Sequence, residues 1–230
     1  MLYGAVIAET ITLNVAGAVQ PLTITVPGTR RPPLNQRLMI DKLKKVNELS
    51  HETIRFPQNF EDLPDVLSHR VWALILERKR NDEAKRRKHY KNLPAKYQRM
   101  ADAAAEAVGE IQPTYLAYYR CLVPVLAQHQ IGNCGEYAAL VVNELLGSVE
   151  EQRIRLLKGG LGHGNNHVCV VLDASRDAKP ADWRSYGDRA VVCDAWLDFV
   201  AVPAEYFRVL NVIKCEFRPV ALKGLADQAD

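Results

Sequence analysis

The sequence lacks the features of a membrane protein or of a disulfide-stabilised secreted protein. Its 230 residues contain no uninterrupted apolar run of about eighteen residues, so we expect no membrane-spanning helix. The N-terminus has no basic segment and Glu9 interrupts its apolar run, so it does not resemble a Sec signal. The five cysteines are an odd number and form no CxxC pair, which favours reduced thiols in a cytoplasm, either its own or that of another cell.

A strong net charge is also missing, although the basic residues are unevenly distributed. Thirty Lys and Arg against twenty-seven Asp and Glu leave a net charge of +3, too small to indicate a polyanionic partner. Between Glu77 and Arg99, however, ten basic residues stand against three acidic ones, a local charge of +7. Only Tyr90 and Tyr97 interleave with these charges, which argues against nucleic acid as a partner. We expect a solvated helix face or a docking surface for an acidic protein or an anionic membrane. The residues of this surface would be Arg78, Lys79, Arg80, Lys85, Arg86, Arg87 and Lys88.

Hydrophobic periodicity divides the chain into three parts, which we expect to form one compact domain. Residues 1–30 alternate apolar and polar side chains and predict a β-hairpin. Residues 35–128 form a helical region, with predicted helices at 35–50, 65–91, 94–108 and 114–128. Residues 129–222 open with the apolar helix CGEYAALVVNELL and continue with the strand-like runs RIRLL, HVCVVLD, AVVCDAWLDFVAV and VIKCEFRPV. A short helix, PAEYFRVL, precedes the last run, and the tail LKGLADQAD is expected to fray. The predicted fold class is therefore α+β, with a helical first half and a helix packed on a sheet in the second.

Cys134 stands where a reactive thiol is expected. It follows a Gly-Asn turn at the start of a predicted helix, where the positive end of the helix dipole stabilises a thiolate. Gly132 and Gly135 would let a substrate approach the sulfur closely. A buried, inert role is the expectation for the other four cysteines, which are Cys121, Cys169, Cys193 and Cys215.

His167 and Asp194 are predicted to meet at one edge of the sheet. His167 opens the run HVCVVLD and Asp194 ends the run AVVCD. If the two runs pair antiparallel with His167 opposite Asp194, then Asp173 lies opposite Asp188. Packing of the Cys134 helix start at that edge would complete a Cys-His-Asp triad, in which the carboxylate orients the imidazole.

The segments GNCGEYA, NHV and CDAW resemble the papain-like and transglutaminase-like cysteine enzyme superfamily, over roughly residues 128 to 200. Small bacterial effector enzymes that deamidate protein glutamine, and effector cysteine peptidases, are the most similar members in size. The resemblance implies a central helix that carries Cys134 on an antiparallel sheet, with His167 as base and Asp194 as orienting acid. It also implies delivery of the chain into a host cell by a bacterium.

The same resemblance suggests which residues surround the triad. Gln128, six residues before the cysteine, corresponds to an oxyanion donor, with Gln130 as its rival and Asn133 beside them. Trp196 resembles an aromatic that shields the acid. No calcium-loop pattern is present, and the remaining zinc interpretation, through His163, His167 and Cys169, lacks a second ligand pair. We therefore expect neither a metal nor another cofactor.

The predicted reaction is attack of Cys134 on an amide carbonyl of a protein substrate through a thioester. Deamidation of a glutamine side chain fits the small size of the chain. Peptide hydrolysis and transamidation share the same first half-reaction and stay open. A non-catalytic interaction module, binding through the basic helical half, is the alternative from another class.

Overall fold

A computed structural model describes residues 8–13, 22–27, 34–54, 56–57, 99, 114–132, 134–161, 165–212 and 217–227. The helix predicted at 65–91 lies outside these ranges, as does the helix predicted at 94–108 except for Arg99, which is helical. The seven basic residues of the predicted docking surface also lie outside them. In the described part of the chain no helix is long and apolar enough to cross a membrane. Cys134, Cys169 and Cys193, the three cysteines whose side chains are described, form no disulfide.

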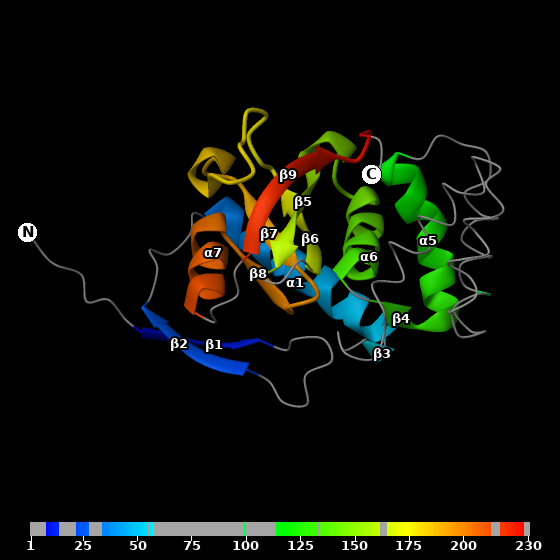
Figure 1. Cartoon of the computed structure of the whole chain (residues 1–230), viewed down its shortest axis with the longest axis horizontal. Coiled ribbons are helices and arrows are strands. Elements are labelled where there is room, and N and C mark those ends of the chain that lie inside the picture. Colours follow the sequence, from blue (N-terminus) through cyan, green and yellow to red (C-terminus); the bar gives the residue numbers. More distant parts are fainter. Residues whose placement is uncertain are drawn as a thin grey trace, which may run out of the picture.

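A five-stranded antiparallel sheet lies at the centre of the molecule, with strand order β8-β7-β6-β5-β9 (Figure 1). The strands are β5 (Ile154–Leu161), β6 (Asn165–Leu172), β7 (Val191–Asp194), β8 (Phe199–Ala201) and β9 (Phe217–Gly224). Every residue of β7 and β8 is buried, which explains why these strands read as continuous apolar runs. The sheet confirms the predicted α+β class.

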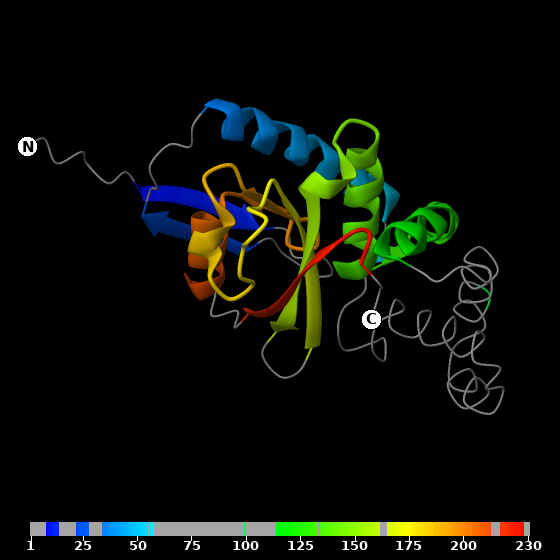
Figure 2. The ribbon, with the colours of Figure 1, turned by 90° about the horizontal axis from the view of Figure 1, so that it is seen from above.

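The helix that begins at Cys134, α6 (Cys134–Leu146), packs against β6 and β5. It is apolar on nearly all sides because it is enclosed by other elements. On its outer side lies α5 (Tyr115–His129), and α1 (Leu34–Thr53) crosses it and contacts β7 and β8. Both α1 and α5 occur where the periodicity predicts them. The two views agree that α6 and α7 (Pro203–Val212) lie on either side of the sheet (Figures 1 and 2).

The strand-like run from Ala190 to Val202 contains two strands joined by a turn, and the first ends at Asp194, as predicted. β7 ends at Asp194, and β8 returns antiparallel from Phe199. Asp198, the last residue of the turn, has φ 53°, the left-handed conformation that Asp tolerates better than most residues. The extra turn leaves Asp194 at a strand end with its side chain fully buried.

The expectation that the tail frays is wrong for Leu222 to Asp227, the part of the tail that the structure describes. β9 extends to Gly224, and Leu225 is buried. The N–H groups of Tyr115 and Leu116, at the start of α5, donate to the carbonyls of Asp227 and Leu225. These bonds satisfy donors that a helix start leaves without intrahelical partners, and so fix the chain there.

The smaller elements surround this core. β1 (Ala8–Leu13) and β2 (Leu22–Pro27) pair antiparallel, as the alternation in residues 1–30 predicts. β3 (Phe56–Pro57) and β4 (Ile131–Gly132) form a short parallel pair just before α6. Two short 3-10 helices, η1 (Glu151–Arg153) and η2 (Trp183–Tyr186), precede β5 and β7.

Candidate functional site

His167 and Asp194 form a buried hydrogen-bonded pair. Nε2 of the imidazole lies 2.6 Å from Oδ2 of the carboxylate, and the two side chains are 1% and 0% exposed. Oδ1 of Asp194 accepts from the backbone N–H of Leu197, in the turn that follows β7. A charged group removed from water needs such hydrogen-bond partners. The end of β7 and the start of β6 bring the two side chains together.

The pairing register differs from the predicted one by two residues. The ladder between β6 and β7 matches Val170 with Cys193, which by continuation places Cys169, and not His167, across from Asp194. His167 is then the diagonal neighbour of Asp194. Side chains two residues apart on a strand share a face, so a shift of two still brings imidazole and carboxylate together. The predicted pairing of Asp173 with Asp188 is wrong for the same reason.

Cys134 lies at the first position of α6 and is 8% exposed. Its side chain forms a hydrogen-bonding and electrostatic interaction with His167 that contributes to the pKa of the imidazole. Because Nε2 is occupied by Asp194, Nδ1 is the ring nitrogen left for the sulfur. Nδ1 is buried, on the side of the ring away from Asp194.

The position of the imidazole determines its charge. Burial alone lowers the pKa of His167, but the charge of Asp194, the hydrogen bond to Asp194 and the interaction with Cys134 together raise it to about 10. His167 is therefore protonated at neutral pH, and both ring nitrogens can donate. A protonated imidazole beside a thiol at a helix N-terminus is the environment that favours a thiolate.

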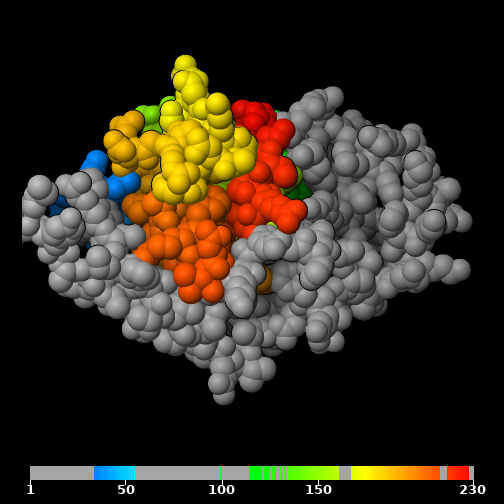
Figure 3. Space-filling model, turned by 60° about the vertical axis from the view of Figure 1, so that its left-hand side comes forward, coloured from blue at the N-terminus to red at the C-terminus, as the bar shows by residue number. Residues whose placement is uncertain are grey.

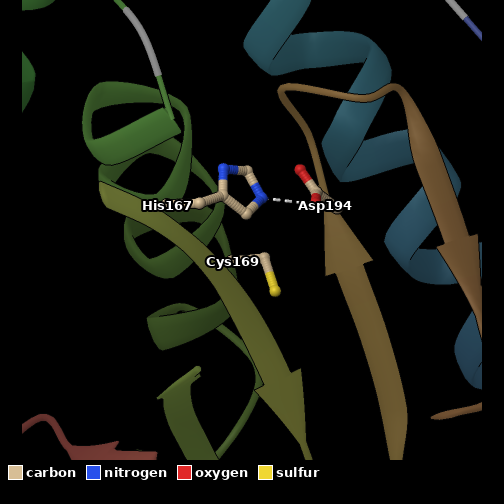
Figure 4. Close-up of side chains that lie close together, drawn as sticks. All are labelled: His167, Cys169 and Asp194. Carbon is tan, nitrogen blue, oxygen red and sulfur yellow. Dashed lines mark hydrogen bonds and ion pairs between the residues drawn. The ribbon is translucent and has the colours of Figure 1, made fainter. Parts of the chain in front are cut away.

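Cys169 joins the pair from the same strand face (Figure 4). Ligand atoms of His167, Cys169 and Asp194 lie within 4.8 Å of one another, and all three residues are buried. Burial raises the pKa of the Cys169 thiol well above its usual value, and the nearby charge of Asp194 adds to the effect. Its S–H donates to the hydroxyl oxygen of Tyr206, at 3.7 Å. A protonated thiol of this kind is a poor nucleophile.

These three residues are the one described cluster with the ligand chemistry of a metal site. Metal binding requires a deprotonated thiol and an available carboxylate oxygen. Oδ2 of Asp194 already accepts from both His167 and Tyr206, each at 2.6 Å. The cluster therefore fits a hydrogen-bond network better than a metal centre.

Two aromatic rings enclose the imidazole. Trp196 lies with its ring centroid 5.6 Å from that of His167, and Phe217, on β9, lies 5.4 Å away and edge-on. Trp196 is buried and follows Asp194 by two residues, as the resemblance implies. The rings reduce the access of water to the ion pair, which strengthens its electrostatic attraction.

The predicted oxyanion residues are only partly described. Gln130 ends α5 in the left-handed conformation, with φ 56°, and its backbone N–H donates to Leu126. Gln128 lies in the last turn of the same helix, but its side chain is outside the described part, as is Asn133. The assignment of oxyanion donors therefore stays a prediction. His163, in the alternative zinc set, also lies outside it.

Gly132 has a packing role that the sequence does not reveal. A Cβ at this position would lie 2.5 Å from Cβ of Glu136 and 2.8 Å from Cδ1 of Ile54. Only glycine allows the chain entering α6 to approach so closely. The close approach explains a glycine near Cys134 without reference to a substrate.

Sequence reasoning missed Tyr206, Phe217 and the position of Cys169. The position of Cys169 could have been predicted, because residues i and i+2 of a strand share a face and Cys169 follows His167 by two residues. Tyr206 and Phe217 come from α7 and β9, and their contacts with the site depend on tertiary packing.

No family model, curated protein or solved structure matches the chain. What the site can do is therefore inferred from its own geometry and chemistry.

Proposed function

We propose that this protein is a thiol hydrolase of the papain-like and transglutaminase-like kind, with a triad of Cys134, His167 and Asp194. The observation that carries the proposal is the position of the imidazole: one nitrogen bonds Asp194, and the ring also interacts with the Cys134 side chain. This is the arrangement of nucleophile, base and orienting acid that covalent catalysis requires.

In the first half-reaction the Cys134 thiolate attacks the carbonyl carbon of an amide. The tetrahedral intermediate collapses, the C–N bond breaks, and the departing nitrogen takes the proton of His167. The products are a thioester on Cys134, ammonia or an amine, and a neutral imidazole. Asp194 keeps its hydrogen bond with Nε2–H, which leaves Nδ1 to exchange protons.

In the second half-reaction water resolves the thioester. The neutral imidazole takes a proton from water, the oxygen attacks the thioester carbon, and the C–S bond breaks. A carboxylic acid leaves and the pair of Cys134 thiolate and His167 imidazolium is restored, so atoms and protons balance over the cycle.

We take a glutamine side chain as the substrate group. Cys134 is only 8% exposed, and aromatic rings lie beside His167. These features favour a slender group that enters end-on, rather than an extended main chain. Peptide hydrolysis differs from deamidation only in the leaving group, and transamidation differs only in the acceptor of the acyl group.

Selective alkylation tests the nucleophile. Folded protein is treated with iodoacetamide at several pH values below 7, and the modified cysteines are mapped by mass spectrometry. Cys134 should react faster than every other thiol, because it lies at a helix N-terminus and its side chain interacts with the imidazole of His167. Cys169 and Cys193, both buried with raised pKa values, are internal controls. Reaction of Cys134 at the rate of an ordinary thiol would contradict the proposal.

The reaction type is read from the mass of the product. Labelled casein and a carbobenzoxy-Gln-Gly dipeptide are incubated with wild type and with Cys134→Ala. Release of ammonia with a gain of about one dalton per site indicates deamidation, fragments indicate proteolysis, and adducts with added amine indicate transamidation. Equal turnover by wild type and Cys134→Ala would contradict a role for Cys134.

A further inference from the structure

The carboxylate of Asp194 has a second strong donor besides the imidazole. The hydroxyl of Tyr206, on α7, donates to Oδ2 at 2.6 Å, the oxygen that also bonds His167. Tyr206 and Asp194 are both 0% exposed. With the N–H of Leu197 on Oδ1, the carboxylate is held by three donors from three segments of the chain.

The tyrosine ring is fixed so that its hydroxyl can point only toward the site. Tyr206 lies on the inward face of α7, three residues after Pro203 and three before Val209, which are also buried. Phe199 stacks on its ring, and Phe207 and Phe217 meet it edge-on. The surfaces of α7 and β9 lie side by side on the same face of the molecule (Figure 3).

Cys169 completes a directed chain of hydrogen bonds. Its S–H donates to the hydroxyl oxygen of Tyr206, which donates its own proton to Asp194. Burial raises the pKa of Tyr206 well above 10, and the charge of Asp194 raises it further. The hydroxyl therefore stays protonated across the pH range in which the site would work, and serves only as a donor toward the carboxylate.

We infer that Tyr206 is a positioning residue of the triad: it holds the carboxylate of Asp194 aimed at Nε2 of His167, in a place that water does not reach. The inference rests on the proposed function. A donor to a carboxylate favours the charged form, and an unsatisfied buried carboxylate would take up a proton more readily. Protonated Asp194 could no longer stabilise the imidazolium that forms the pair with Cys134.

The test is the pH dependence of Cys134 alkylation in Tyr206→Phe. The lost hydrogen bond acts on Cys134 through Asp194 and His167, so the acid side of the alkylation profile should move to higher pH in the variant. The titratable groups that face Asp194 are His167 and Cys169 from β6, Tyr206 from α7 and Cys193 from β7, and Cys134 acts on the imidazole from α6.

Tyr186→Phe is the matched control. Tyr186 is also 0% exposed and donates a hydrogen bond of 2.7 Å, but to the backbone carbonyl of Pro180, away from the triad. Tyr186→Phe should lower thermal stability by about as much as Tyr206→Phe and leave the acid side of the alkylation profile at the same pH. A Tyr206→Phe protein that is folded, with an unshifted profile and a rate reduced equally at all pH values, would show a merely structural role.

A second measurement keeps this inference separate from the proposed function. Histidine labelled with 15N reports the Nε2–H proton of His167 by NMR, whether or not Cys134 is reactive. In Tyr206→Phe the titration of this signal on the acid side should move to higher pH, and an unmoved titration overturns the inference. Ordinary reactivity of wild-type Cys134 would instead overturn the thiol hydrolase. Should Tyr206→Phe fold poorly, the double variant with Cys169→Ala removes the thiol left without an acceptor and allows the same NMR comparison.

Discussion

Gly159 lies directly across from His167 in the ladder between β5 and β6, and its missing side chain makes room for Phe217. A Cβ at Gly159 would collide with the backbone carbonyl of Arg218 and would lie 2.6 Å from Cε2 of Phe217. Phe217 in turn packs edge-on against the imidazole. The close approach of β9 to β5 therefore depends on this glycine.

Gly159→Ala should disturb the site through β9. Because the added methyl group meets backbone atoms, we expect a loss of about 1–3 kcal/mol in the free energy of unfolding. Alkylation of Cys134 should slow as Phe217 moves from the imidazole. Gly160→Ala is the control, since a Cβ there meets no atom within 4 Å. Urea denaturation and alkylation rates measure both effects, and equal behaviour of the two variants would contradict this role of Gly159.

Asp194→Asn should leave the fold intact and remove most of the activity. The amide cannot hold the imidazolium, and loss of tautomer control costs about 10⁴ in rate in triads of this kind. Turnover of the glutamine dipeptide by the purified variant measures the effect. Asp198→Asn, in the turn after β7, is a matched control: Asn tolerates its positive φ, and Asp198 contacts Asn47 and His51 instead of the triad. Unchanged turnover in Asp194→Asn would remove Asp194 from its role.

The charged imidazole predicts a specific dependence of stability on pH. The pKa of His167 is about 10 in the folded protein against an ordinary value of 6.5. Between these values the folded state keeps a proton that the unfolded chain has lost. The stabilisation is therefore fully present below pH 6.5 and is lost as pH rises through about 10, by at most about 1.4 kcal/mol per pH unit.

The slope is measured in Cys134→Ala, because a thiolate at Cys134, as proposed, would offset the proton that His167 keeps on folding. Urea denaturation midpoints of this variant should fall between about pH 6.5 and 8.5. Asp194→Asn in the same background removes the charge that raises the pKa of His167, so its midpoint should depend less on pH. A Cys134→Ala midpoint that is constant over this range, or rises with pH, would be inconsistent with the buried pair of His167 and Asp194.

Cys169→Ala distinguishes a hydrogen-bond network from a metal centre. The thiol donates only a weak bond to Tyr206, so the variant should keep Cys134 reactive, with a change in rate of less than about tenfold. Removing a metal ligand would instead abolish activity and lower the metal content. Activity assays and metal analysis of wild type and variant, before and after chelation, separate the two outcomes.

The sequence alone was sufficient for the parts of the site that depend on local pattern. The apolar run after Cys134 predicts α6, and the β-branched runs around His167 and Asp194 predict two strands whose ends carry the polar residues. Local periodicity reflects which face of a helix or strand is buried, so it predicts the element without knowledge of the elements that pack against it. The same patterns predict the ends of α1 and α5 within three residues.

Relations between distant segments were decided only by tertiary structure. The β6–β7 register differs by two residues from the predicted one, although the strand ends at Asp194 in both. Tyr206 reaches Asp194, and Phe217 reaches His167, only when α7 and β9 fold onto the strands that carry the pair. Alternation along a strand specifies a face but not a partner, so any even shift satisfies the same sequence pattern. The sequence therefore determined which side chains turn inward, and long-range packing determined which of them meet.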